Sequence, residues 1–194
     1  MCRSFRPEPV AAELVDRLVD LASRSPSAGK TQGWHLVVLE GEQTDRFWRH
    51  AFPAERRAGF TWPGLFGAPV ILLPFADPDA YVARYAEPDK ARTGLGTGPG
   101  AWPTPYWTVD ASMSVMTLLL AAEDEGLGAL FFAVFNGERE VRAELKVPDG
   151  LQLLGAIALG WPAPEPSPGV SAARMRRSPN QIIHRNGWSP QTPR

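Results

Sequence analysis

Arginine residues gather at two places in this sequence, one near each end. Arg3 and Arg6 flank Ser4 at the N-terminus, and Arg174 and Arg177 stand near the C-terminus. Guanidinium groups are permanent cations that bind phosphate through paired hydrogen bonds, and a hydroxyl adds a further donor. The two groups are compatible with one shared anion, although solvated surface charge is the alternative for each group taken alone.

A second candidate site is the turn SPSAGKTQGW, which follows residue 24. Ser27, Lys30 and Gln32 offer a hydroxyl, an ammonium and an amide beside backbone N–H groups, a combination that suits the edge of a polar heterocycle. A plain connection between a helix and a strand is the alternative, because Pro26 and Gly29 by themselves explain a break there.

Several common catalytic arrangements are missing from the sequence. His35, His50 and His184 are far apart, and no CxxC or HExxH spacing is present, so we expect no metal site. The run GLGTGPG has proline where the GxGxxG pattern needs its last glycine, which argues against a Rossmann or P-loop site. Cys2 has no partner motif for nucleophilic catalysis. The sequence therefore offers no convincing catalytic acid, base or nucleophile.

The composition limits the classes of protein. The chain has 194 residues, 44% of them apolar, which fits a single domain over 1–194 or one half of an intertwined dimer. Its 20 Lys and Arg nearly balance its 21 Asp and Glu, so we expect no nucleic-acid partner. No apolar run reaches the ~18 residues that span a bilayer, so we expect no membrane insertion. A single cysteine suits the reducing cytoplasm.

Hydrophobic periodicity predicts the order of the secondary structure. Apolar residues at helical spacing predict helices at 9–24, 43–51, 108–126 and 138–145. Compact apolar runs predict strands at 34–39, 68–75, 129–135 and 151–161. We expect the helix at 108–126 to be central and buried, the strand at 34–39 to be largely buried, and Pro74 to mark a strand end or an edge. The alternation implies one layered α/β sheet domain.

Two stretches fall outside this pattern. Residues 87–107 are too rich in glycine and proline for a helix or strand interior, and they predict a loop of functional size. Residues 162–194 form a proline-rich C-terminal arm with an extended, strand-like stretch at 181–184. Such an arm buries little apolar surface by itself, so we expect it to dock on its own sheet or on a second subunit.

Together, these segments resemble the nitroreductase family of FMN-dependent oxidoreductases. The motifs cover nearly the whole chain in the family's order: RSFR with PEPV, SRSPSAGKTQGWHLVVL, YWTVDASMSVMTLLLAAEDEGLGALFF, and ALGWPAPEP with RMRRSPNQIIH. The resemblance implies an α+β fold, a three-layer sandwich with a central mixed sheet flanked by helices. It also implies an intertwined homodimer that binds FMN in two clefts between the subunits.

The resemblance assigns most candidate residues to one flavin site. The N-terminal group would receive the phosphate, ribityl chain and pyrimidine edge of FMN, and the C-terminal arginines would close on the phosphate. The turn would approach the same flavin from the other subunit, and residues 132–134 would lie against the isoalloxazine. The expected cofactor-binding residues are Arg3, Ser4, Arg6, Ser27, Lys30, Gln32, Phe132, Ala133, Val134, Arg174 and Arg177.

The resemblance also implies that a planar substrate stacks on aromatic side chains, beneath a lid formed by residues 87–107. The candidates are Phe66, Trp102, Tyr106, Trp107 and Phe135, with core packing as the alternative. NAD(P)H would pass hydride to flavin N5, and a second substrate would then take the electrons in a ping-pong cycle. Cations would stabilise the negative charge that develops near N1 and O2 of the flavin, and Arg6 and Lys30 are the candidates.

Three positions depart from the family pattern. Cys2 stands where an additional arginine is common, so one phosphate contact is absent or comes from Arg176. Lys30 stands where asparagine is usual, and its charge would favour anionic reduced flavin and raise the flavin potential. QGW replaces QPW, which affects the stiffness of the loop more than the chemistry.

Three functions are compatible with these residues. The first is an FMN-dependent NAD(P)H oxidoreductase that acts on a nitroaromatic, a quinone or a similar planar acceptor. The second uses the same flavin for a dedicated biosynthetic substrate or takes electrons from a deazaflavin donor. The third is a non-catalytic protein that sequesters FMN.

Overall fold

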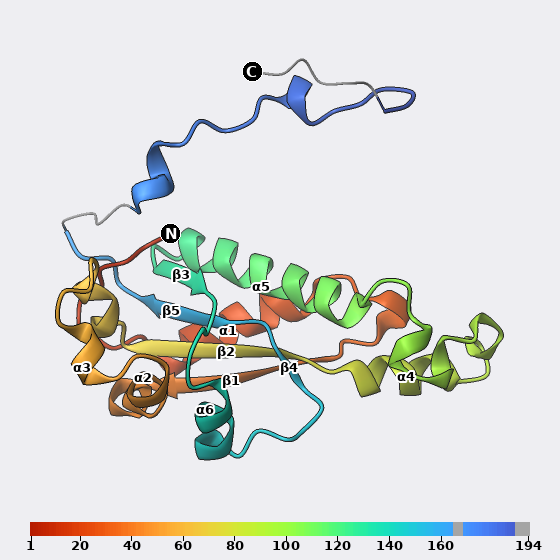
Figure 1. The fold of residues 1–194 in the computed structure, drawn as a ribbon, viewed down its shortest axis with the longest axis horizontal. Helices are drawn as coiled ribbons and strands as arrows, with labels where there is room; N and C mark the ends of the chain where they lie inside the picture. Colours follow the sequence, from red (N-terminus) through yellow and green to blue (C-terminus); the bar gives the residue numbers. More distant parts are fainter. Residues whose placement is uncertain (165–168, 189–194) are drawn as a thin grey trace.

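One five-stranded sheet forms the centre of the fold in the computed structural model, which describes residues 1–164 and 169–188 (Figure 1). The strands run in the order β1-β2-β5-β3, with β4 beside β2. They are β1 (Trp34–Glu40), β2 (Val70–Ala76), β3 (Gly128–Phe132), β4 (Gln152–Leu153) and β5 (Ala156–Gly160). Their pairs are antiparallel, where a mixed sheet was expected, because the C-terminal arm leaves the sheet and adds no parallel strand.

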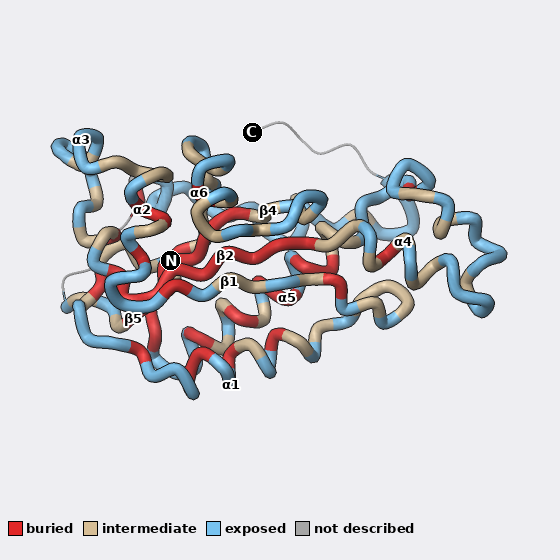
Figure 2. Tube along the Cα trace, turned by 90° about the horizontal axis from the view of Figure 1, so that it is seen from below, coloured by how far each residue is buried: buried red, intermediate tan, exposed pale blue. Residues whose placement is uncertain are grey.

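Helices cover both faces of this sheet, so the predicted three-layer α+β sandwich is confirmed (Figures 1 and 2). The helices are α1 (Ala12–Ser23), α2 (Asp45–Ala51), α3 (Ala54–Arg57), α4 (Pro78–Ala86), α5 (Tyr106–Asp124) and α6 (Glu138–Leu145). Strand side chains alternate between the faces. Val70 and Leu72 pack with α1 and α5, whereas Ile71 and Leu73 pack on the opposite face with α2.

The predicted helices and strands are present, except that the strand expected at 151–161 is divided into β4 and β5. Two further expectations about strands are wrong. In β1 only Leu39 is fully buried, because β1 is an edge strand and not an inner one. Pro74 lies inside β2, which is a central strand. β2 pairs with β5 as far as Leu72 and with β4 from Phe75, so the missing N–H of Pro74 falls in the gap between the two partners.

Helix α5 is half-exposed in this chain, where we expected it to be central and buried. Its buried residues, such as Ser114, Val115 and Leu118, lie toward α1 and the sheet. Met113, Met116 and Leu120 are exposed by 42%, 52% and 59%. Within one chain, other elements pack against only one side of this apolar helix, and the other side exposes an apolar face to solvent.

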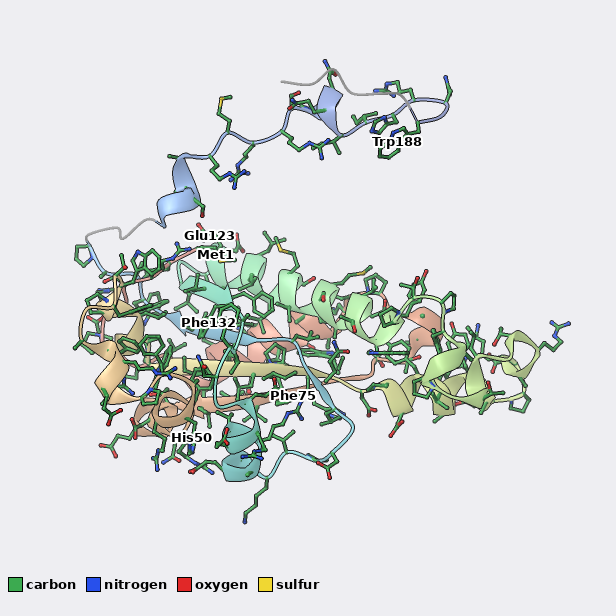
Figure 3. All side chains as sticks on the ribbon, viewed as in Figure 1. Met1, His50, Phe75, Glu123, Phe132 and Trp188 are labelled. Atoms are coloured by element: carbon green, nitrogen blue, oxygen red, sulfur yellow. The ribbon has the colours of Figure 1, made fainter. Side chains whose placement is uncertain are left out.

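The C-terminal arm extends away from the sheet, and Trp188 lies far from Phe132 (Figure 3). The stretch predicted to be strand-like at 181–184 forms no strand. It begins instead at the end of a short 3-10 helix, Pro179–Gln181, because no free strand edge lies beside it. Residues 165–168 and 189–194 of the arm lie outside the described residues. Among the described residues no helix is both long and apolar enough to cross a membrane.

The junction between α2 and α6 depends on the absence of a side chain at Gly137, whose φ is +70°. A Cβ there would overlap the backbone carbonyl of His50. We expect Gly137→Ala to lower the free energy of unfolding by about 2–4 kcal/mol, from left-handed strain and overpacking combined. Gly59→Ala is the matched control, with φ +82° and open space around it. Equal losses for the two variants in urea denaturation would contradict the close contact.

Candidate functional site

The N-terminal arginines are placed by a short extended segment that pairs with the end of the sheet. The backbone N–H of Cys2 donates to Ala129 O at 2.8 Å, and that of Arg6 donates to Trp161 O at 2.9 Å. Ser4 O accepts from the N–H of Ala163 at 3.0 Å. The side chain of Phe5, in the middle of this segment, is buried and anchors the segment in the core. Arg3, Ser4 and Arg6 are therefore held by backbone bonds at one end of the molecule.

A cavity of about 350 Å³ opens beside this segment, between β3 and the stretch from α2 to residue 66. Its walls are flat and apolar. The rings of Trp48 and Phe132 are nearly parallel with centroids 5.9 Å apart, and Phe66 meets Trp48 edge-on at 5.0 Å. Such walls suit a planar ring system. The lining residues are Arg3, Phe47, Trp48, Ala51, Phe52, Phe60, Trp62, Leu65, Phe66 and 130–136.

Arg3 brings a positive charge to this cavity. Its guanidinium lies 5.1 Å from the ring centroid of Trp62 and against Gly169 of the C-terminal arm. In residues 1–164 and 169–188 no carboxylate pairs with Arg3. Arg6 differs, because its Nε lies 3.2 Å from Glu8 Oε2 and its guanidinium lies 6.0 Å from the Trp161 ring. Arg3 is thus the cation available to an anionic ligand here.

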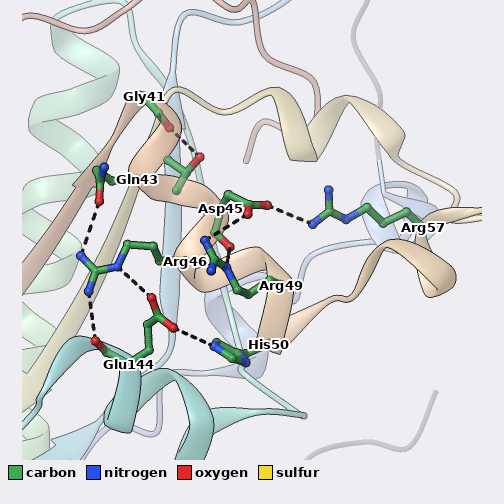
Figure 4. A network of polar contacts seen from close by, with 9 residues as sticks. Gly41, Gln43, Asp45, Arg46, Arg49, His50, Arg57 and Glu144 are labelled. Carbon is green, nitrogen blue, oxygen red and sulfur yellow. Dashed lines mark hydrogen bonds and ion pairs between the residues drawn. The ribbon is translucent and has the colours of Figure 1, made fainter.

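A polar network joins α2 and α6, which support the two walls of the cavity (Figure 4). Glu144 on α6 accepts a hydrogen bond from Arg46 Nε at 3.1 Å, and its other carboxylate oxygen lies 3.3 Å from Nε2 of His50. Arg46 and His50 both belong to α2, which carries Phe47 and Trp48. Helix α6 follows directly after the cavity-lining residues 133–136. Glu144 therefore fixes one wall relative to the other.

The turn of residues 27–32 lies at the opposite end of the fold. Gly29, Lys30 and Gln32 all have left-handed φ angles, of +62°, +55° and +54°. The Ser27 hydroxyl accepts from the N–H of Gln32 at 3.0 Å. Left-handed geometry costs about 1–2 kcal/mol for each residue other than glycine, so the surroundings must maintain this turn.

Trp102, Tyr106 and Trp107 lie at the same end as the turn and not over the cavity. Trp102 is buried and packs edge-on against Tyr85, with ring centroids 4.6 Å apart. The predicted loop is present, as three 3-10 turns between Ala91 and Ala101. Within one chain these rings pack with their own loop and helices, and in that chain the loop is not a lid over the cavity.

The predicted site residues therefore form two separate groups. Arg3, Phe66 and 132–134 line the cavity, and Ser4 and Arg6 lie on the segment beside it, whereas the turn and the aromatic group lie at the other end of α5. The turn is bonded to α5 at Asp110, whereas the N-terminal segment is bonded at Ala129, in the strand that follows the other end of α5. At 1.5 Å per helical residue, Asp110 and Asp124 are about 20 Å apart. One copy of the chain cannot bring both groups to one small ligand.

The C-terminal arginines belong to neither group in this chain. Arg174 is exposed, and Arg177 donates to the backbone carbonyl of Gln181 within the arm. Phe135 is 89% exposed at the rim of the cavity. In the described part of the chain, no cluster of His, Cys, Asp or Glu is arranged to hold a metal ion.

Sequence reasoning missed several residues that shape the two groups. Trp48, Phe52, Phe60 and Trp62 line the cavity but show no regular period, and only the density of aromatic residues between 47 and 66 signals a cluster. Asp110 is a lone acidic residue inside an apolar helix sequence, and this isolation is the signal that could have predicted its role.

Comparison with known proteins adds to this geometry. The model of the Nitroreductase family matches residues 1–161. The NADH dehydrogenase of Thermus thermophilus is 30% identical over 180 residues, which are 86% of this chain and 84% of the relative. The 5,6-dimethylbenzimidazole synthase of Rhodospirillum rubrum is 30% identical over 200 residues, covering 94% and 88%. The solved structure of a nitroreductase-like protein from Streptococcus mutans shares the fold, with a TM-score of 0.73, 18% identity and coverage of 94% and 91%.

The contact between α2 and α6 predicts a dependence of stability on pH. His50 first, and then Arg46, hold the pKa of Glu144 below its usual value. A carboxyl group of this kind stabilises the fold above its unfolded pKa, about 4.3, and the contribution is lost as the pH falls through the folded pKa. We expect Glu144→Gln to be less stable than the wild type at neutral pH, with a difference that shrinks below about pH 4.

Urea denaturation across this pH range measures the effect. Glu42→Gln is the control, because Glu42 is exposed and makes no ion pair with the described residues. A difference between wild type and Glu144→Gln that stays constant down to acid pH would contradict the contact.

Proposed function

Because this chain belongs to the nitroreductase family, we propose that it is an FMN-dependent oxidoreductase that passes hydride from NAD(P)H to a planar acceptor such as a nitroaromatic or a quinone. FMN, when bound, supplies the redox chemistry through its N5 atom, in a ping-pong exchange between the two substrates. The protein binds and orients the ring, admits flat substrates and stabilises negative charge.

The cavity carries this proposal. It joins flat aromatic walls, the segment 132–134 and the cation of Arg3 in one place, and these features fit a planar ring that bears a phosphate. Ser4 and Arg6 lie on the same N-terminal segment. In the proposal these three residues bind the phosphate, ribityl chain and pyrimidine edge, residues 132–134 lie against the ring, and Phe66 stacks on the substrate.

We further propose that the working form is a homodimer. The two groups of site residues lie at opposite ends of α5, which is about 20 Å long between Asp110 and Asp124, and α5 leaves an apolar face uncovered. A second copy related by a twofold axis would cover this face and bring the partner's turn to the cavity. The partner subunit's Ser27, the partner subunit's Lys30 and the partner subunit's Gln32 would then complete the cofactor site.

The remaining predicted residues take their place in the same dimer. Arg174 and Arg177 close on the phosphate from the arm, and Arg6 acts with Lys30 on the charge of the reduced ring. The partner subunit's Tyr106 and the partner subunit's Trp107 stack on the substrate opposite Phe66. Trp102, expected to join them, is buried against Tyr85 and supports them from behind. The single cysteine, which cannot form an internal disulfide, is consistent with a cytoplasmic location.

A second candidate is a flavin enzyme with a dedicated biosynthetic substrate. It is favoured by the relative named 5,6-dimethylbenzimidazole synthase, which is as similar in sequence as the relative named NADH dehydrogenase. The same cavity is also compatible with a deazaflavin donor and with a non-catalytic protein that sequesters FMN. All of these functions share the proposed cofactor site and differ in what exchanges electrons with it.

An absorbance spectrum of the purified protein, followed by anaerobic NAD(P)H titration, tests the proposal. We expect yellow protein that bleaches with NAD(P)H and regains its colour with a quinone. Protein that is reduced only by a deazaflavin, or by light, would favour the second candidate. Protein that keeps FMN and reacts with no acceptor would favour sequestration. Colourless protein that cannot be reconstituted with FMN would contradict every one of these functions.

Lys30 gives a prediction about the flavin potential. Removal of a positive charge beside the reduced pyrimidine destabilises the anion, so Lys30→Met should lower the midpoint potential by roughly 30 mV, for about 1.4 kcal/mol of lost stabilisation. Lys146→Met is the matched control, because Lys146 is an exposed lysine with the same φ of +55° as Lys30, at the end of α6. An equal potential in Lys30→Met and wild type would place the ammonium away from the ring.

A further inference from the structure

The turn that carries Lys30 is held from outside by two charged side chains. The first is Asp110 on α5, which is only 6% exposed. Its Oδ2 atom accepts hydrogen bonds from the N–H of Ala28 at 2.7 Å and from the hydroxyl of Tyr81 at 2.8 Å. Burial first, and Asp110 second, raise the pKa of Tyr81, which keeps its hydroxyl protonated as a donor. Asp110 is thus bonded to the turn from a rigid helix.

The second is Arg84 on α4. Its Nε donates to the backbone carbonyl of Gly29 at 2.9 Å. Its two terminal nitrogens donate to Asp89 at 2.7 and 2.8 Å, and this bidentate pair fixes the direction of the guanidinium. The ring of Tyr85 lies so close to Gly29 that a Cβ there would be 3.0 Å from the ring. Asp110 and Arg84 therefore clamp consecutive residues of the turn, one through an N–H and one through a carbonyl.

These bonds leave the Lys30 ammonium as the exposed charge of the turn. The Thr31 hydroxyl donates to Ala28 O at 2.6 Å, and the Ser27 hydroxyl accepts from the backbone N–H of Gln32. The hydroxyl groups on either side of Lys30 are therefore bonded within the turn. No carboxylate of residues 1–164 or 169–188 pairs with Lys30. The left-handed backbone conformation is unfavourable for a lysine, so surrounding contacts must hold Lys30 in it.

We infer that Asp110 and Arg84 are positioning residues, which hold the 27–32 turn in its left-handed form and so present the Lys30 ammonium to the flavin across the dimer interface. The inference rests on the proposed function for the location of the flavin. It adds that the effect of Lys30 on the reduced ring depends on two side chains that do not touch the cofactor.

Two measurements on Asp110→Asn and Arg84→Gln test the inference. The first is the rate at which trypsin cuts the intact FMN-free protein after Lys30, followed by mass spectrometry. We expect cleavage at this bond to become about tenfold faster, because the turn opens more often, with an unchanged rate elsewhere. The second is the midpoint potential of the FMN-loaded variants, which should fall toward that of Lys30→Met. Adding Lys30→Met to Asp110→Asn should then lower the potential no further than Lys30→Met alone.

Matched control variants separate the loss of the turn's conformation from the loss of a charge. Asp124→Asn alters another acid at the far end of α5, and Arg92→Gln alters an exposed arginine in the neighbouring loop. Arg84→Gln carries the test if Asp110→Asn fails to fold. The inference is overturned by folded, yellow variants at both positions with the potential of their controls, whatever their cleavage rates. An unchanged potential in Lys30→Met would instead remove the proposed location of Lys30 itself.

Discussion

The straight length of α5 is the constraint on which the rest of this structure depends. A helix is rigid over this length, so the turn bonded at Asp110 and the N-terminal segment beyond Asp124 stay about 20 Å apart. The same helix leaves Met113, Met116 and Leu120 uncovered. Separation of the two half-sites and exposure of an apolar face are two results of one element, and the proposed second copy of the chain would account for both.

The sheet explains why the cavity can be precise although loops form much of it. Strand β2 is buried on both faces and anchors the layers on either side. The N-terminal segment is bonded to the ends of β3 and β5, and Glu144 ties α6 to α2. The cavity walls are thus fixed to the rigid centre through backbone bonds and one ion-paired carboxylate, which is the support that a planar ligand requires.

The two halves of the candidate site are built in different ways. At the cavity the walls are apolar rings, and the charge of Arg3 lies over one of them, Trp62. At the turn the backbone is strained, and polar contacts from α4 and α5 maintain it. Packing stabilises the first half, whereas hydrogen bonds preserve an unfavourable conformation in the second. Strain of this kind is concentrated at functional sites, where pre-organisation outweighs its cost in stability.

The sequence by itself determined the family and the order of most helices and strands, because periodicity and turn residues are local properties. It missed α4, although Asp77 before Pro78 is a recognisable helix start whose carboxylate accepts from Ala80. Only the tertiary structure decided that β1 is an edge, that Pro74 fits between two partner strands, and that the site residues lie in two groups. These properties depend on which segments become neighbours, and contacts between residues distant in sequence, such as Ala28 with Asp110, leave no local pattern to recognise.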